Sequence, residues 1–269
     1  MYLTDYHTHT VLSPDGSAPL SAMADAAVAA GLDELCVTDH CDLLDPEGRP
    51  ADRYDWPPAL EQYARTVPAY RDRLTLRLGL EFGMGHLYPA VSRTILDRPE
   101  LDFVLGSVHN LSPKKGGGDF YYLDYPDPAA CYAALDDYFS SLTQLAVSDC
   151  YDVLSHIIYP LRYMDHPITL DRYRDILDGI FRAAAERGRG IELNTWRGRT
   201  LREWLPVLRQ FRACGGEIVT IGSDAHTPDG VGKGCAQACQ LLAEAGFRYL
   251  ATYEKRKPVF HTLQGGSFL

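Results

Sequence analysis

Short β-rich runs alternate with longer helical stretches along the chain, and this alternation limits the fold more than any other feature of the sequence. Strands that alternate with helices form parallel sheets, because each crossover helix packs back onto the sheet through a right-handed connection. No low-complexity linker and no short sequence repeat divides the 269 residues. The predicted strands span residues 2–9, 34–40, 74–82, 103–109, 153–157, 190–195 and 217–224.

Consecutive strand–helix units without a boundary favour a single α/β domain over residues 1–269, closed into a barrel. An open, doubly wound sheet is the alternative. No GxGxxG motif opens a helix after the first predicted strand, so a dinucleotide site has little support. The lysine and glycine run at residues 114–118 lacks the spacing of a phosphate-binding P-loop.

Charge and composition argue against several classes of protein. The formal net charge of -10 disfavours a broad nucleic-acid-binding face, which needs clustered Lys and Arg. No apolar stretch is long enough to span a membrane, and the first residues, MYLTDYHTHT, do not resemble a signal peptide. Scattered cysteines without a CxxC pair are typical of reduced thiols, so we expect a cytoplasmic protein. The sequence carries no signal for the oligomeric state.

Histidines and carboxylates fall repeatedly at the ends of the predicted strands. Side chains at i and i+2 of a strand share a face, so His7 and His9 can hold one metal ion, and Asp224 and His226 repeat this spacing. The carboxyl ends of parallel strands converge on one rim of a barrel. A single histidine is more often a packed core residue, but repetition over many strands indicates a metal centre. The candidate ligands are His7, His9, Asp15, His40, Glu81, His109, His156, Asp224 and His226.

The candidate ligands are more numerous than one ion requires. A catalytic zinc takes about three protein ligands plus water, so this set suits two or three ions, with Glu81 shared between two of them. Imidazole and carboxylate groups suit Zn, Mn or Fe(II). Such a cluster can deliver a hydroxide at neutral pH and clamp a phosphate for in-line displacement. We expect Asp5 and Asp39 to have a structural or ligand-orienting role instead.

A series of segments resembles the polymerase-and-histidinol-phosphatase (PHP) superfamily, and the segments occur in order over nearly the whole chain. They are DYHTHT, SPDG, VTDH, GLEF, GSVHN, SHI, ELNT and GSDAH. The resemblance implies a distorted (β/α)7 barrel. For a chain of this length it further implies a histidinol-phosphatase of histidine biosynthesis, a phosphoric monoester hydrolase that acts on a small phosphate monoester with a metal-bridging hydroxide as nucleophile.

The resemblance also implies a trinuclear metal centre. Carried over by position, the three ligand sets would be His7, His9, Glu81 and Asp224; Glu81, His109 and His156; and Asp15, His40 and His226. Some family members have histidine where this chain has Asp15, and we expect this difference to affect the metal preference of the third ion.

The resemblance assigns the chemistry to a subset of these residues. Glu81, Asp224 and His226 are the predicted catalytic residues, with proton transfer to the leaving group assigned to His226 or Asp224. Family members often bind phosphate through arginines, which suit bidentate contact. Arg162 and Arg197 are the predicted phosphate-binding residues, and Arg199 is an alternative to Arg197.

Three other functions compete with this hypothesis. The same barrel could serve a nuclease or a nucleotide or nucleoside bisphosphate phosphatase, although the negative charge weighs against a DNA substrate. Amidohydrolase-type barrels also begin with HxH, but they commonly bridge their metals with a carboxylated lysine, and none of the predicted strands ends in lysine. A metal-binding regulatory module would bind ions without turning over any phosphoester.

Overall fold

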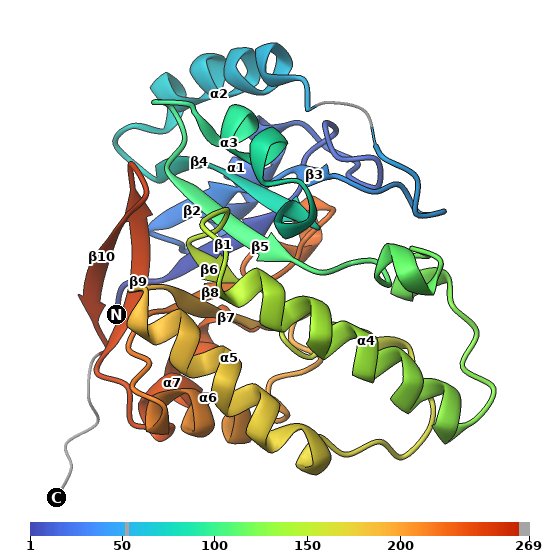
Figure 1. The fold of residues 1–269 in the computed structure, drawn as a ribbon. Helices are drawn as coiled ribbons and strands as arrows, with labels where there is room; N and C mark the ends of the chain where they lie inside the picture. The colour runs from blue at the N-terminus through green and yellow to red at the C-terminus, as the bar shows by residue number, and fades with distance from the viewer. Residues whose placement is uncertain (52–53, 264–269) are drawn as a thin grey trace, which may run out of the picture.

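The computed structural model describes residues 1–51 and 54–263, which form a mostly parallel sheet surrounded by helices (Figure 1). Hydrogen bonds join the strands in the order β1-β2-β4-β5-β6-β7-β8, with β3 also paired to β4. The strand bounds are β1 (Thr4–Thr8), β2 (Glu34–Val37), β3 (His40–Asp42), β4 (Thr75–Gly83), β5 (Phe103–Ser107), β6 (Val153–Leu154), β7 (Gly190–Asn194) and β8 (Val219–Gly222).

The sheet closes on itself at the carboxyl ends of its first and last strands. The backbone N–H of Asp224 donates to the carbonyl of His7 at 2.9 Å, and the N–H of His9 donates to the carbonyl of Ala225 at 2.8 Å. The predicted barrel is therefore confirmed over the open sheet, in a nearly closed form. Closure also places the HxH segment beside the DAH segment, although more than two hundred residues separate them in the sequence.

A helix follows each strand position around the barrel. Its buried face has the spacing of an amphipathic helix, as in α5, where Leu177, Ile180, Phe181 and Ala184 are buried. The helices are α1 (Leu20–Ala29), α2 (Trp56–Tyr70), α3 (Pro89–Leu96), α4 (Pro128–Ala146), α5 (Arg174–Glu186), α6 (Trp204–Ala213) and α7 (Cys235–Glu244). Of these, α3 was not predicted from the sequence.

The predicted strand over residues 34–40 is divided into β2 and β3. Both parts keep one register along β4, with Val37 opposite Leu78 and His40 opposite Glu81. Between them the N–H of Thr38 donates to the carbonyl of Thr8 on β1 at 2.8 Å. The chain therefore continues to the rim of the barrel, where it carries His40 beside Glu81.

An antiparallel hairpin of β9 (Tyr249–Glu254) and β10 (Lys257–Thr262) covers the end of the barrel where the strands begin (Figure 1). The turn residues Lys255 and Arg256 have φ of 50° and 62°, the left-handed conformation of a tight hairpin turn. The N–H of Tyr253 donates to the Tyr6 hydroxyl at 2.8 Å. Because this end is covered, the opposite rim is the open end of the barrel.

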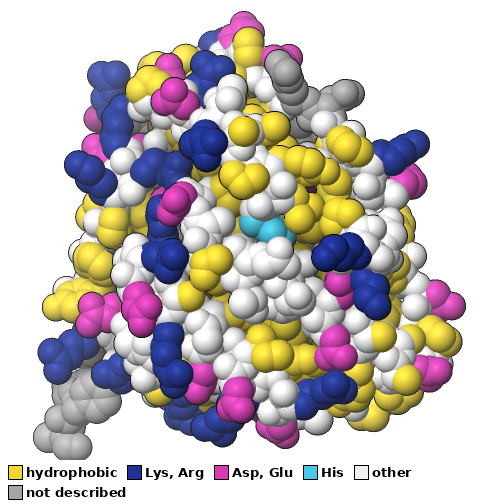
Figure 2. Space-filling view, viewed as in Figure 1, with side chains coloured by type: hydrophobic (Ala, Val, Ile, Leu, Met, Phe, Trp, Pro, Cys, Tyr) yellow, Lys and Arg dark blue, Asp and Glu magenta, His cyan; other side chains and the backbone are white. Residues whose placement is uncertain are grey.

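On the face shown in Figure 2, basic and acidic side chains are interspersed. All seven cysteines are free thiols, as their spacing predicted. In the part of the chain that the structure describes, no helix has the length and apolarity needed to cross a bilayer.

Candidate metal centre

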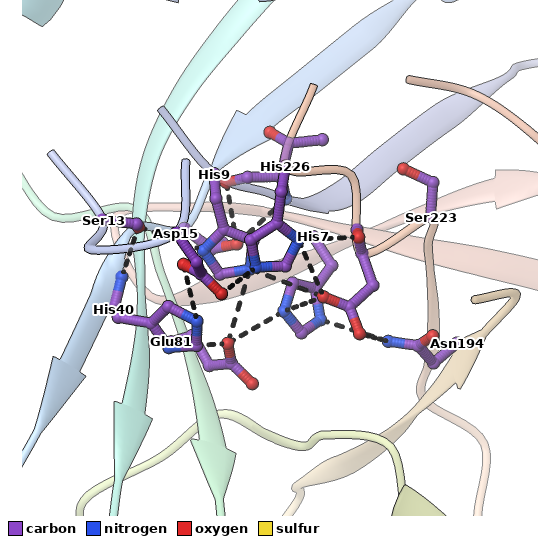
Figure 3. Close-up of polar contacts among 12 residues, drawn as sticks. His7, His9, Ser13, Asp15, His40, Glu81, Asn194, Ser223 and His226 are labelled. Carbon is purple, nitrogen blue, oxygen red and sulfur yellow. Dashed lines mark hydrogen bonds and ion pairs between the residues drawn. The ribbon is translucent and has the colours of Figure 1, made fainter. Parts of the chain in front are cut away.

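A cavity of about 930 Å³ opens at the carboxyl ends of the strands, and most of the predicted ligands line it. The other two, His7 on β1 and His9 just after it, are fully buried and contact the cavity residues Glu81 and Asp224. The structure therefore brings the predicted ligands together from strands that lie far apart in the sequence, and Figure 3 shows the central ones.

The first group of ligand atoms lies around one oxygen of each of two carboxylates. His7 Nε2 is 3.0 Å from Glu81 Oε2 and 3.5 Å from Asp224 Oδ1. His9 Nε2 is 3.5 Å from the same Glu81 oxygen and 3.6 Å from the same Asp224 oxygen. Two imidazole nitrogens and two carboxylate oxygens thus surround one point, as a four-coordinate cation requires.

The second group lies around the other oxygen of Glu81. His156 Nε2 is 2.7 Å and His109 Nε2 is 3.0 Å from Glu81 Oε1, and the two nitrogens are 3.3 Å apart. The Ser107 hydroxyl donates to this oxygen at 2.9 Å. Glu81 therefore faces two groups of imidazoles with its two oxygens, as expected of a carboxylate shared between two ions.

The third group lies nearer the solvent. His226 Nε2 is 2.9 Å from Asp15 Oδ2, and His40 Nε2 is 3.7 Å from Asp15 Oδ1. The ring of His9 stacks on both His40 and His226, with centroid distances of 4.3 Å and 4.1 Å. Ligand atoms of His9, His40 and His226 also lie within 4.8 Å of one another, so His9 lies next to this group as well as the first.

The buried imidazoles have the free nitrogens that a metal ion needs. His7 Nε2, His9 Nε2 and His226 Nε2 are buried without a hydrogen-bond partner among the described residues. Leaving such atoms unpaired costs about 1–3 kcal/mol each. Cations between these nitrogens and the nearby carboxylates would remove that cost, so the donor set fits metal ions.

Burial and neighbouring charges place two central groups in the forms that bind metal. Burial would raise the pKa of Glu81, but the charges of His7, His109 and His40 hold it well below its usual range, so Glu81 is a carboxylate. Burial, together with the neighbouring histidines, lowers the pKa of His9 to about 3, which keeps its imidazole neutral.

Two carboxylates that the sequence analysis did not select contact the far nitrogens of candidate ligands. Glu192 Oε1 is 2.7 Å from His7 Nδ1, and Asp42 Oδ1 is 2.7 Å from His109 Nδ1. Glu192 lies in the ELNT segment on β7, and Asp42 lies two residues after His40 on β3. The i, i+2 rule that selected His9 would have selected Asp42.

The aspartates predicted to orient ligands act through other residues. Asp39 Oδ1 accepts a hydrogen bond at 2.8 Å from the Ser13 hydroxyl, which in turn lies 3.2 Å from His9 Nδ1. Asp5 accepts a hydrogen bond from the N–H of Ser223 at 2.8 Å and so fixes the residue before Asp224. Neither carboxylate contacts an imidazole in the described structure.

The arginines predicted to bind phosphate both line the cavity, as does Arg199. Arg162 donates to Asp224 Oδ2 at 2.8 Å and to Asn194 Oδ1 at 2.7 Å. Burial would raise the pKa of Asp224, but His7 and this guanidinium hold it well below its usual range, which argues against Asp224 as a proton donor. Arg197 Nε is buried without a partner among the described residues.

A nearly closed β/α barrel with imidazoles and carboxylates gathered at its open rim defines a metal-dependent hydrolase. The model of the PHP domain family matches residues 5–196, and the chain belongs to this family. The match begins just before the HxH segment and ends just after the strand that carries Glu192.

Relatives match over nearly the full chain. The probable histidinol-phosphatase of Clostridium acetobutylicum is 30% identical, with 94% of this chain and 97% of the relative covered. The histidinol-phosphatase of Lactococcus lactis is 27% identical, with 94% and 95% covered. A probable histidinol-phosphatase of Deinococcus radiodurans is 30% identical, with 95% and 98% covered.

Solved structures agree with the barrel. The histidinol phosphate phosphatase of Lactococcus lactis, crystallised with zinc, L-histidinol and phosphate, superposes with a TM-score of 0.80 at 27% identity and covers 96% of this chain and 98% of its own. A putative histidinol phosphatase from Listeria monocytogenes shares the fold with a TM-score of 0.72 at 16% identity, covering 88% of this chain and 100% of its own.

Proposed function

We propose that the protein is a metal-dependent phosphatase that converts L-histidinol phosphate and water to L-histidinol and phosphate. The convergence of the imidazoles and carboxylates around the two oxygens of Glu81 carries this proposal. Full-length similarity to histidinol-phosphatases, one of them crystallised with zinc and both products of this reaction, supports it.

We propose three metal sites in this cavity, with zinc as the first candidate ion. His7, His9, Glu81 and Asp224 would hold one ion, and Glu81 with His109 and His156 a second. The third would take His40, His226 and Asp15, with Asp15 as the solvent-exposed and most replaceable ligand. Manganese and iron are the other ions that this donor set suits.

The reaction exchanges one P–O bond for another. Bound divalent ions would supply a hydroxide at neutral pH and neutralise the charge on the phosphoryl oxygens. The hydroxide oxygen bonds to phosphorus, the ester P–O bond breaks, and the leaving alkoxide takes a proton. We assign Arg197 and Arg162 to the phosphoryl oxygens, because both line the cavity and guanidinium groups bind such oxygens bidentately. Because Asp224 stays ionised, His226 is the better candidate for the proton transfer.

A substrate panel tests this function. Purified, metal-assayed protein should hydrolyse L-histidinol phosphate with a kcat/KM well above that for mononucleotides, nucleoside bisphosphates and simple phosphate esters. The Glu81→Gln variant, which lacks the shared carboxylate, serves as the inactive control in every assay. A preference for a nucleotide would refute the proposed substrate but not the proposed metal centre. Metal binding without turnover of any phosphate ester would identify a non-catalytic module.

A further inference from the structure

Asp42 is a carboxylate at the rim that the proposed ligand sets do not use. It ends β3, two residues after His40, and its side chain is 24% exposed. Its Oδ1 is 2.7 Å from His109 Nδ1, and its Oδ2 is 3.3 Å from His40 Nδ1. One carboxylate therefore contacts two histidines that belong to two different ligand sets.

The contact with His109 fixes which nitrogen that ring presents to the centre. A neutral imidazole carries its proton on one nitrogen and its lone pair on the other. When Asp42 accepts the proton of Nδ1, the lone pair must lie on Nε2, which faces Glu81 Oε1 at 3.0 Å and His156 Nε2 at 3.3 Å. Asp42 thus lies at the nitrogen of His109 that points away from the centre.

The neighbouring strand leaves space for this contact. Gly83 on β4 is directly opposite Asp42 in the β3–β4 register. A Cβ atom at Gly83 would lie 1.6 Å from Asp42 Oδ1 and 3.3 Å from His109 Nδ1. Any side chain at this position would therefore push the carboxylate away from the imidazole.

We propose that Asp42 is a positioning residue that orients His109 and His40 and thereby couples the stability of two metal sites. Asp42 and His40 also lie close enough to His109 to form a ligand group, so direct coordination by Asp42 is the rival that the experiment must exclude. The proposal rests on the metal centre of the proposed function, but it does not depend on the identity of the substrate.

The test compares Asp42→Ala, Asp42→Asn and Gly83→Ala with Asp149→Asn, a matched charge change at an exposed residue outside the metal cavity. Each variant is loaded with excess zinc, its metal content is measured by elemental analysis, and release is followed against a chelator. Loss of an orienting partner typically costs about 10- to 100-fold in metal affinity. We expect this loss of affinity in Asp42→Ala and in Gly83→Ala. The loss should be smaller in Asp42→Asn, because its amide oxygen still accepts a hydrogen bond. All three variants should reach full metal content at saturating zinc.

Two results would overturn the proposal. A permanent deficit of one ion at saturating zinc in Asp42→Ala would make Asp42 a direct ligand, and a wild-type release profile in Asp42→Ala and Gly83→Ala would give it no role. Circular dichroism checks that each variant is folded. If Asp42→Ala does not fold, the two single variants Asp42→Asn and Gly83→Ala test the proposal. Wild-type protein that binds zinc but does not hydrolyse histidinol phosphate would refute the proposed substrate. It would not contradict the role of Asp42 in metal binding.

Discussion

The replacement of Glu81 by glutamine tests the residue on which the centre depends most. Glutamine keeps the size of the side chain but removes the negative charge between the two groups of imidazoles. Loss of an outer partner alone costs about 10- to 100-fold, so we expect Glu81→Gln to lose more than about 100-fold in turnover and to release metal. Elemental analysis beside steady-state kinetics checks this, and retained activity with full metal content would refute the shared-ligand role.

A second residue-scale prediction separates the two phosphate-binding arginines. Arg162 already pairs with Asp224, so Arg162→Ala should lower metal content as well as activity. Arg197 lines the cavity and has no ion pair among the described contacts, so Arg197→Ala should leave the metal content unchanged. It should raise KM about 10- to 100-fold, which corresponds to the free energy of one hydrogen bond to a charged group. Kinetics and metal analysis of both variants check the difference. An unchanged KM in Arg197→Ala would remove it from the phosphate site.

Sequence patterns predicted which side chains gather at the rim, but not which nitrogen of each histidine each carboxylate contacts. Strand ends and the i, i+2 spacing are properties of the backbone, and they were sufficient for His7, His9 and Glu81. The roles of Asp42 and Glu192 depend on ring orientation, which follows from packing between strands that are distant in the sequence. The same limit explains why the stacking of His9 on His40 and His226 was not predicted.

At the scale of elements, the β9–β10 hairpin was not predicted, because its Lys255–Arg256 turn lacks the glycine or asparagine that usually marks a tight hairpin. We expect Tyr6→Phe to lower the free energy of unfolding by about 1–3 kcal/mol, because it removes the hydroxyl that accepts from Tyr253 N–H and donates to Glu34. Urea unfolding measures the change. Tyr249→Phe, at an exposed site on the same hairpin, is the control, and equal effects of the two would refute the claim.

The short 3₁₀ turn η1 (Gly85–Leu87) carries a histidine outside the metal centre whose ring nitrogens are both buried and unpartnered among the described residues. Burial lowers the pKa of His86 from 6.5 to about 4. The unfolded chain therefore takes up this proton first as pH falls, and the stability that neutral His86 contributes is complete above 6.5 and is lost toward pH 4.

His86→Gln, which cannot titrate, should remove this sensitivity to acid. In metal-free protein the loss of unfolding free energy between neutral pH and about pH 4.5 should be smaller in the variant by on the order of 2 kcal/mol. Urea unfolding at the two pH values measures it. Parallel losses in wild type and variant would show that His86 does not titrate in this range.

For the whole molecule, the alternation of strands and helices predicted the barrel because each β/α unit is local in sequence. Closure is not local, since it depends on contacts such as Asp224 N–H with the His7 carbonyl. The division of one predicted strand into β2 and β3 also depends on a contact between strands, because the N–H of Thr38 donates to the carbonyl of Thr8 on β1. Barrel architecture was therefore accessible from the sequence, while strand ends and the covering hairpin were not.

Closure also makes the metal centre a link between the first and last strands, so removal of metal should lower the stability of the whole barrel. One ion at a hundredfold excess over its Kd stabilises a fold by about 2.7 kcal/mol, and each kcal/mol is worth about 2–4 °C in a protein approaching this size. We expect chelation to lower Tm by at least about 5 °C and to leave the far-UV circular dichroism unchanged at room temperature, because the hydrophobic core does not contain the ligands. Added zinc should restore Tm in wild type but much less in Glu81→Gln. Equal recovery in both would show that the stabilising ions bind elsewhere.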